Sequence, residues 1–340
     1  MRITGIHHVT GISGPAQTNL DFYVGILGLR LVKRTVNFDD PGTYHLYYGD
    51  EIGRPGTIMT FFPWALAVRG RSGRGMTTET AFSVPSASIG FWQARFGEFG
   101  VEIDSVDVRF DERVMRFRDP DGLPLALVED ALSDDLPGWA AGPIDHKYAI
   151  RSFYGVTLAS KAPDETARLL TEVLGFEHIG EEDGRVRFRG GADAPGRIID
   201  IAPSIVLGHQ SAGTIHHVAF RARDDEEQLA WQERVAATGL RVTDVRDRKY
   251  FRSIYFREPG GILFEIATDA PGFTADENAE ALGSRLMLPD WLEERRPQIE
   301  GSLPPLSVPS LEVEADDAVQ TAGEESFPAS DAPGWTGVTI

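Results

Sequence analysis

Residues 118–128, Arg-Asp-Pro-Asp-Gly-Leu-Pro-Leu-Ala-Leu-Val, and residues 257–267, Arg-Glu-Pro-Gly-Gly-Ile-Leu-Phe-Glu-Ile-Ala, are two copies of one pattern. In each copy a Pro-X-Gly turn signal precedes a short apolar run that favours a β-strand. Pro120 and Pro259 are 139 residues apart, which indicates an internal repeat. The fold must therefore use the same unit more than once.

The repeat extends upstream of these turns. Residues 22–29 and 169–176 share a helical apolar pattern that closes on Gly28 and Gly175, the residue type that favours helix C-termini. Aligning all such signals gives four units, at about 3–63, 79–130, 151–203 and 214–268. Each unit predicts an opening strand, a helix, and then strands joined by turns. The opening strands are expected at 6–11, 78–84, 153–159 and 214–221, and the helices at 15–26, 88–99, 163–174 and 226–238.

The fold class predicted from this order is α+β, with curved mixed sheets that carry helices on their outer faces. The Pro- and Gly-containing stretch 137–146 separates the second and third units and predicts a domain boundary. We expect an N-terminal domain at 1–140, a C-terminal domain at 145–275 and an extension at 276–340. Within the extension, residues 289–296 predict a short helix. Residues 301–340 are acidic and Pro-rich, contain no Lys or Arg, and predict an extended tail with Trp335 as its likeliest anchor.

The composition excludes several classes of function. The 340-residue chain carries 33 Lys and Arg against 52 Asp and Glu, a formal net charge of −19, and it has no Cys. The absence of Cys excludes disulfides, thiolate nucleophiles and iron–sulfur clusters. The acidic charge argues against nucleic acid as a partner, because such a partner requires a basic surface. With no apolar run of about 18–20 residues and no signal-peptide pattern, we expect a cytoplasmic protein without a membrane partner. A homo-oligomer is an open alternative.

Two histidine doublets are the first candidates for chemistry. His7-His8 and His216-His217 both fall in opening strands, where alternation predicts one ring on the concave face of the sheet and the other on the opposite face. Glu265 lies within an apolar strand, where a carboxylate is costly to bury unless it is paired or bound to a metal. Two imidazoles and one carboxylate with open positions suit non-haem Fe(II).

The repeat provides an internal control for these residues. Glu265 aligns with Ala126, His8 with Gly155 and His217 with Glu79. The His-His-Glu set is thus confined to the first and fourth units, so the fold itself does not require it. Taken singly, a strand His is most often a hydrogen-bonded, partly buried residue, and Glu265 could pair with Arg257. The combination favours a functional site.

Six segments carry a resemblance to a known family: 5–10, 31–37, 43–48, 55–63, 215–220 and 255–265. Through them the chain resembles the vicinal-oxygen-chelate superfamily, which is built from paired βαβββ modules. Within it, the chain is similar to the ring-cleaving dioxygenases that open hydroquinones and chlorohydroquinones. The resemblance covers about residues 3–275 and implies four βαβββ modules paired into two curved mixed-sheet domains.

The resemblance also implies roles for individual residues. His8 from the N-terminal domain and His217 and Glu265 from the C-terminal domain would be the metal ligands, with Fe(II) as the expected metal and Mn(II) as the alternative. Around the metal, the resemblance implies catalytic or supporting roles for His7, Thr10, His216 and Tyr255. It also implies an Arg near the substrate, either Arg248 or Arg252. We expect Phe264 or Tyr255 to line the ring pocket.

The function implied is extradiol-type cleavage of a hydroquinone- or catechol-type aromatic diol with O₂, in which the metal lowers the pKa of a bound phenol. His216 or Tyr255 would handle protons. Three alternatives stay open. The first is a metal-dependent isomerase or lyase of the same superfamily, the second is a non-catalytic small-molecule binding protein, and the third is a metal-free homologue in which Glu265 pairs with Arg257.

Overall fold

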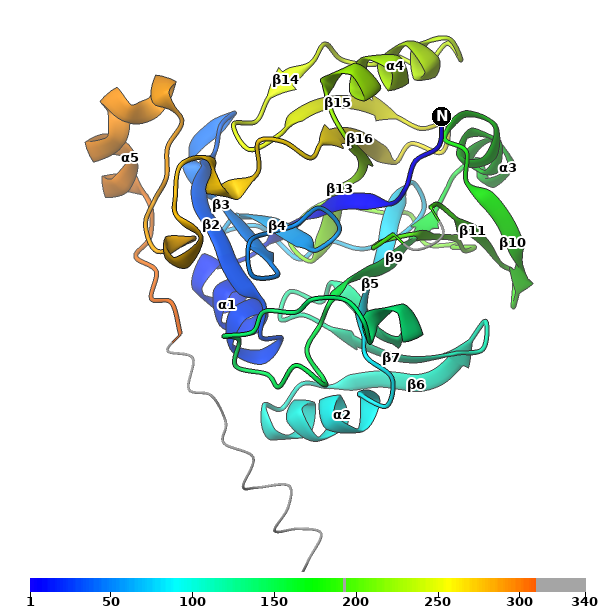
Figure 1. The fold of residues 1–340 in the computed structure, drawn as a ribbon, viewed down its shortest axis with the longest axis horizontal. Coiled ribbons are helices and arrows are strands. Elements are labelled where there is room, and N and C mark those ends of the chain that lie inside the picture. Colours follow the sequence, from blue (N-terminus) through cyan, green and yellow to red (C-terminus); the bar gives the residue numbers. More distant parts are fainter. Residues whose placement is uncertain (192–193, 310–340) are drawn as a thin grey trace, which may run out of the picture.

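The computed structural model describes residues 1–191 and 194–309 and contains four βαβββ modules (Figure 1). The first module comprises β1 (Ile6–Ser13), α1 (Ala16–Leu20), β2 (Arg30–Asn37), β3 (Asp40–Gly49) and β4 (Ile58–Pro63). The second comprises β5 (Met76–Val84), α2 (Ile89–Glu98), β6 (Ile103–Arg109), β7 (Glu112–Arg118) and β8 (Pro124–Glu129). The third comprises β9 (Ser152–Ala159), α3 (Pro163–Arg168), β10 (Glu177–Glu182), β11 (Arg185–Arg189) and β12 (Ile198–Ile201). The fourth comprises β13 (Thr214–Ala222), α4 (Asp225–Ala236), β14 (Arg246–Asp247), β15 (Arg252–Arg257) and β16 (Leu263–Thr268).

The modules pair into two eight-stranded mixed sheets. The first sheet has the order β14-β15-β16-β13-β1-β4-β3-β2, and the second has the order β10-β11-β12-β9-β5-β8-β7-β6. The predicted α+β class, with four βαβββ modules in two curved sheets, is confirmed. The first module pairs with the fourth and the second with the third, so each sheet crosses the boundary predicted at 137–146. The domain limits 1–140 and 145–275 follow chain order and stay a prediction.

The helices form where the apolar spacing predicts them. The two patterns that close on glycine contain an α-helix followed by a wider, π-helical turn, which is η1 (Asp21–Ile26) after α1 and η3 (Leu169–Val173) after α3. Gly28 (φ +68°) and Gly175 (φ +77°) then adopt the left-handed conformation that ends each helix. None of the described helices has the length and apolar character needed to cross a bilayer.

The repeated turns fasten neighbouring modules together. The carboxylate of Glu258 accepts hydrogen bonds from the backbone N–H groups of Gly260 and Ile262 and from the Thr166 hydroxyl of α3. Asp119 does the same in the other copy, with two backbone N–H groups and the Tyr23 hydroxyl. Each turn therefore orders its own hairpin and holds the helix of the preceding module.

The central strand pairs contain β-bulges at repeated positions. Where β1 pairs with β13, Ile6 and His8 face consecutive residues, which leaves His7 as an extra residue, and His216 is extra in the same way on β13. Where β5 pairs with β9, Thr78 and Tyr154 are the extra residues. A bulge kinks the strand and re-aims its side chains, so these positions break the alternation of a regular strand.

The extension packs on the first module. The helix predicted at 289–296 is present as the 3₁₀ turn η6 (Asp290–Arg295), which leads into α5 (Arg296–Ser302) beside β2 and β3 (Figure 1). The remaining 3₁₀ turns are η2 (Ala131–Ser133), η4 (Phe273–Ala275) and η5 (Ala279–Ala281). Beyond α5, Leu303 is buried and the Tyr44 hydroxyl donates to the Pro304 carbonyl at 2.9 Å. The described start of the predicted tail thus lies against the protein, while residues 310–340, including Trp335, lie outside the described residues.

These contacts predict that a chain ending at residue 302 is less stable than a chain ending at residue 309. The shorter chain loses the buried Leu303, the Tyr44 hydrogen bond and two hydrogen bonds between Gln17 and Ser307. We expect its free energy of unfolding to be lower by about 3 kcal/mol. Urea titrations of the two truncated proteins measure the difference, and coincident curves would show that 303–309 contributes no stability.

Candidate functional site

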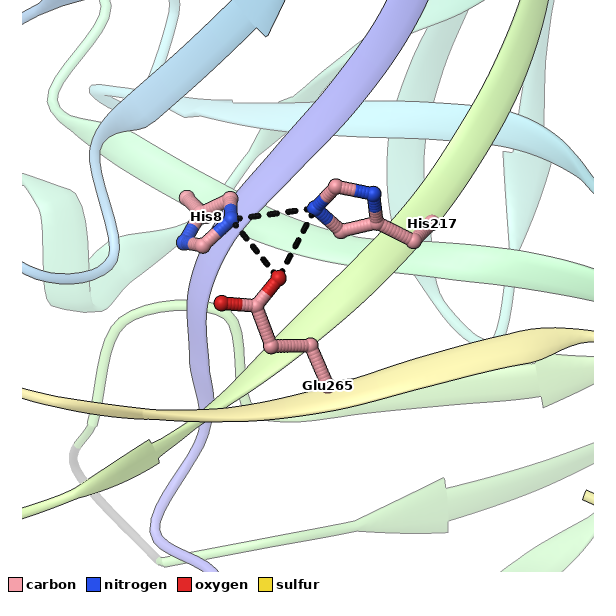
Figure 2. A group of neighbouring side chains, drawn as sticks. All are labelled: His8, His217 and Glu265. Carbon is pink, nitrogen blue, oxygen red and sulfur yellow. Dashed lines mark hydrogen bonds and ion pairs between the residues drawn. The ribbon is translucent and has the colours of Figure 1, made fainter. Parts of the chain in front are cut away.

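The three predicted metal ligands meet at the centre of the first sheet (Figure 2). His8 lies on β1, His217 on β13 and Glu265 on β16, and their side chains point toward one another. The Nε2 atoms of His8 and His217 are 3.2 Å apart, and they lie 3.4 and 2.9 Å from Glu265 Oε2. All three residues are buried, and Glu265 is 0% exposed. Residues 209 positions apart in the chain thus place three potential ligand atoms within 4.8 Å of one another.

This convergence follows from a local two-fold relation between the strands. Val9 of β1 pairs directly with Val218 of β13. In an antiparallel pair, a two-fold axis at that point relates the residue before each valine, which is His8 on one strand and His217 on the other. Ala219 then pairs with Glu265 on β16, which adds the carboxylate to one side of the axis.

Each doublet fixes the orientation of its ligand ring. The Nδ1 atoms of His7 and His8 are 3.0 Å apart, and those of His216 and His217 are 2.7 Å apart. If Nε2 of His8 and His217 is to bind a metal, Nδ1 of each must carry the proton and donate it to the neighbouring imidazole. His7 in turn has a hydrogen bond to the backbone of Thr268. Burial lowers the pKa of His7 and of His217, so these rings are neutral at pH 7.

The two rings of each doublet do not point to opposite faces of the sheet, contrary to the strand alternation predicted from the sequence. We expected one ring on each face of the sheet, but both rings of a doublet lie within hydrogen-bonding distance. The physical reason is the bulge at His7 and the bulge at His216, which bring consecutive side chains to the same region.

The carboxylate of Glu265 requires a cation. Burial alone would raise its pKa, but His8 and His217 lower it well below the ordinary value, so the group is ionised. Its Oε1 accepts a hydrogen bond from the Ser253 hydroxyl, whereas the buried Oε2 has no hydrogen-bond donor in the described residues. His217 Nε2 is close to Oε2 without the alignment of a hydrogen bond. The imidazole nitrogens of two histidines and an undonated carboxylate oxygen fit a divalent metal ion.

A cavity of about 270 Å³ opens over this centre. Of the other predicted residues, Thr10, His216, Arg248 and Tyr255 line it, whereas His7 lies behind His8 against Phe251. The full lining comprises His8, Thr10, Asn37, Phe38, Asp39, His45, Tyr47, Phe62, Trp64, His216, His217, Arg248, Phe251 and Tyr255. Four phenylalanine and tryptophan rings are therefore available to contact a flat apolar ligand.

The structure distinguishes between the arginines and the aromatic residues that the sequence left as alternatives. Arg248 reaches the cavity, where its Nε donates to the Tyr255 hydroxyl at 3.2 Å, while Arg252 is exposed and pairs with Asp225. Arg257 donates to the Gly261 carbonyl and makes no ion pair with Glu265 in the described part of the chain. Of the two aromatic residues expected to line the ring pocket, Tyr255 does so and Phe264 does not. Its ring packs in the core because neighbouring residues of a strand face opposite sides.

The sequence reasoning missed a polar chain on the opposite wall of the cavity. The Tyr47 hydroxyl lies 2.8 Å from His45 Nδ1, and His45 Nε2 lies 2.7 Å from Thr60 Oγ1, which is 3.1 Å from Thr10 Oγ1. Burial lowers the pKa of His45, so that its neutral ring accepts from one hydroxyl and donates to the other. A signal was present, because His45 and Tyr47 alternate within segment 43–48.

Thr60 occupies the position related to Glu265 by the two-fold axis. It pairs with Thr10 on β1 as Glu265 pairs with Ala219 on β13, and it pairs with Tyr47 as Glu265 pairs with Tyr255. A hydroxyl already bonded to His45 and Thr10 is a poor metal ligand. The centre therefore offers three protein ligands and open positions.

The second sheet has the same backbone but no such centre. Glu79 pairs with Thr157 and Ala81 with Gly155 and Ala126, which agrees with the sequence alignment of the repeat. A Cβ atom at Gly155 would lie 2.1 Å from the Ile198 carbonyl oxygen, so no histidine fits there. Ion pairs fill this concave face instead, such as Arg109 with Glu79 at 2.7 Å.

Comparisons with known proteins agree with this fold. The chain matches the Glyoxalase/Bleomycin resistance protein/Dioxygenase superfamily over residues 5–127 and 155–266. It is 50% identical to MhqO of Bacillus subtilis, named provisionally as a ring-cleaving dioxygenase, over 91% of this chain and 98% of that protein. It is 32% identical to the chlorohydroquinone/hydroquinone 1,2-dioxygenase of Sphingobium indicum over 86% of this chain and 93% of that protein. A crystal structure from Bacillus subtilis, provisionally named a dioxygenase, has 50% identity and a TM-score of 0.88, covering 91% of this chain and 99% of that one.

The geometry predicts that Glu265→Gln abolishes tight metal binding, since a neutral amide replaces an anionic ligand poorly. We expect metal affinity to fall by about tenfold or more. Glu79→Gln is the matched control, because Glu79 is also a buried glutamate in a central strand pair but pairs with Arg109. It should keep full metal content while losing about 3 kcal/mol of stability. Elemental analysis of both purified variants decides, and full metal in Glu265→Gln would remove Glu265 from the ligand set.

Proposed function

This chain belongs to the Glyoxalase/Bleomycin resistance protein/Dioxygenase superfamily, and on that premise we propose that it is a non-haem Fe(II)-dependent dioxygenase that cleaves the ring of hydroquinone- or catechol-type diols with O₂. Relatives named as ring-cleaving dioxygenases support a dioxygenase role. The observation that carries the proposal is the His8, His217 and Glu265 set at the base of an aromatic-lined cavity.

The number of ligands favours this reaction over the isomerase or lyase alternative. Isomerases of the superfamily often use a fourth protein ligand, and the position related to Glu265 holds Thr60. Three protein ligands leave adjacent positions for a diol oxygen and for O₂. Fe(II) in this site would supply a path for electrons from the bound diol to O₂. Mn(II) is the alternative metal for the same ligands.

The cavity residues suit binding and proton transfer. Burial lowers the pKa of His216 to about 3, so its ring is neutral at pH 7. Burial and the charge of Glu265 raise the pKa of Tyr255, which keeps its hydroxyl protonated. Arg248, whose guanidinium donates to that hydroxyl and to the Asp39 carboxylate at 3.2 Å, lies at the cavity wall. We infer that Tyr255 donates a hydrogen bond to the bound diol, that His216 accepts a proton from it, and that Arg248 stabilises the anion formed. We also infer that His7 orients the ring of the metal ligand His8 and that Thr10 supports the cavity wall beside it.

Ring cleavage in this reaction breaks one carbon–carbon bond beside a hydroxyl-bearing carbon. Both atoms of O₂ enter the product, so the hydroxyl-bearing carbon becomes a carboxylic acid and its former neighbour becomes a carbonyl. All carbon atoms of the ring are kept. The product is therefore an acyclic carboxylate that carries more negative charge than the diol at neutral pH.

Oxygen uptake tests the proposed reaction directly. The Fe(II)-loaded protein, prepared anaerobically, is mixed with hydroquinone, methylhydroquinone or catechol, and O₂ consumption is recorded. We expect consumption to match the loss of diol one to one. A protein that binds these diols without using O₂ would be a binding protein, and turnover in the absence of O₂ would identify an isomerase or lyase.

The proposed roles predict that His216→Ala and Tyr255→Phe retain metal but lose turnover. General acid–base groups contribute about 10²–10⁴-fold, so each variant should be slower by a factor in that range. Elemental analysis checks the first expectation and oxygen uptake the second. Phe264→Leu on the adjacent strand β16 is a control, since Phe264 packs in the core and should affect stability more than turnover. Wild-type turnover in both test variants would remove them from the mechanism.

A further inference from the structure

A second cavity lies behind His216. It has a volume of about 170 Å³, and His216 lines both this cavity and the one above the metal ligands. Its walls come from the start of β5, the loop before β13, the residue Lys161 ahead of α3, and the turn between β15 and β16. Three of the four modules therefore meet here, and His216 is the residue that this cavity shares with the candidate active site.

The second cavity is positively charged. Arg74, Lys161 and Arg257 line it, and no acidic side chain is among its described lining residues. Within residues 1–191 and 194–309 none of these three cations forms an ion pair. Glu258, the neighbouring acid, is buried, and its carboxylate oxygens accept hydrogen bonds from backbone N–H groups of its own turn. Within the same residues it does not form an ion pair with these cations. Three uncompensated cations around one small cavity are unusual in a protein with a net charge of −19.

Two glycines leave room for these cations. Gly75 has a φ of +84°, and a Cβ atom there would lie 2.6 Å from Lys161 Cε, so any other residue would displace the lysine. Gly261, at φ +95°, offers its carbonyl to Arg257, which donates to it at 2.9 Å. In the fourth module, the repeated turn at 257–261 thus holds the Arg257 guanidinium at the rim of the cavity.

We propose that the cavity of Arg74, Lys161 and Arg257 is a binding site for a small organic carboxylate, namely the ring-opened product of the adjoining active site. The identity of the ligand rests on the proposed function, whereas the existence of an anion site rests on the cavity alone. Carboxylates form strong, charge-assisted hydrogen bonds with guanidinium and ammonium groups. The uncharged diol lacks that charge, so the cavity discriminates product from substrate.

The place of the cavity suits the release of product. Ring opening would create a carboxylate in the cavity that His216 lines, and the positive charge of the second cavity would stabilise that anion as it leaves. His216 contributes the wall that the two cavities share.

Calorimetric titration with maleate, a four-carbon dicarboxylate, tests the site in the metal-loaded protein. The test variant is Arg74→Gln/Lys161→Gln, because both side chains are exposed and neither makes a side-chain hydrogen bond or an ion pair in the described residues. The control is Arg241→Gln/Arg285→Gln, which removes the same charge from exposed residues outside the cavity. We expect maleate affinity to fall by about tenfold or more in the test variant and to stay within twofold in the control.

Each other outcome has a defined meaning. Equal losses in the two double variants would reflect net charge alone and would overturn the site. Unchanged affinity in the test variant would place maleate elsewhere, such as on the metal, and would also overturn it. Inorganic phosphate binding more tightly than maleate would contradict a carboxylate ligand. If maleate binding depends on Arg74 and Lys161 but no diol supports oxygen uptake, the anion site stands and the proposed function fails.

Discussion

The buried carboxylate of Glu265 is the constraint on which the first sheet depends. A carboxylate with no exposed surface is destabilising by several kcal/mol unless every oxygen has a partner. Ser253 on the adjacent strand serves one oxygen, and the imidazoles of His8 and His217 face the other. These partners come from β15, β1 and β13, so the carboxylate is accommodated only when both modules are paired in this register. The pairing of the two modules in this register therefore also assembles the site.

The junction between modules explains why the same backbone can hold either a metal centre or none. Both central strand pairs carry bulges at equivalent positions, at His7 and His216 in one sheet and at Thr78 and Tyr154 in the other. The bulges therefore occur in both copies of the repeat, whereas the two histidine doublets lie in the first sheet. In the second sheet, Glu79 is the counterpart of His217 and needs a cation just as Glu265 does. Arg109 provides that cation, so the same electrostatic demand is met there by a side chain.

The features that the sequence predicts are those that local patterns determine. The turns at Pro120 and Pro259, the helices that end at Gly28 and Gly175, and the residues able to bind a metal all follow from short segments. The pairing of the first module with the fourth does not, because every opening strand has the same apolar pattern and no local signal selects its partner. The same limit applies to the bulges, which exist only relative to a partner strand. It also applies to His45, whose role comes from Thr60 on a neighbouring strand.

The two-fold relation at Val9 and Val218 also shows where the two sides of the site differ in charge. His8 matches His217 and Tyr47 matches Tyr255, but Thr60 stands where a second glutamate would complete the symmetry. A second carboxylate would cancel the charge of a divalent ion, whereas a single one leaves it positive. The Arg248 guanidinium lies on the Tyr255 side, and the neutral His45 chain lies on the Tyr47 side. The two walls of a cavity whose backbone is nearly symmetric therefore carry different polar groups, with an Arg248–Asp39 ion pair on one side only in the described part of the chain. Under the proposed function, the departure of Thr60 from the two-fold relation would give a bound substrate one preferred orientation.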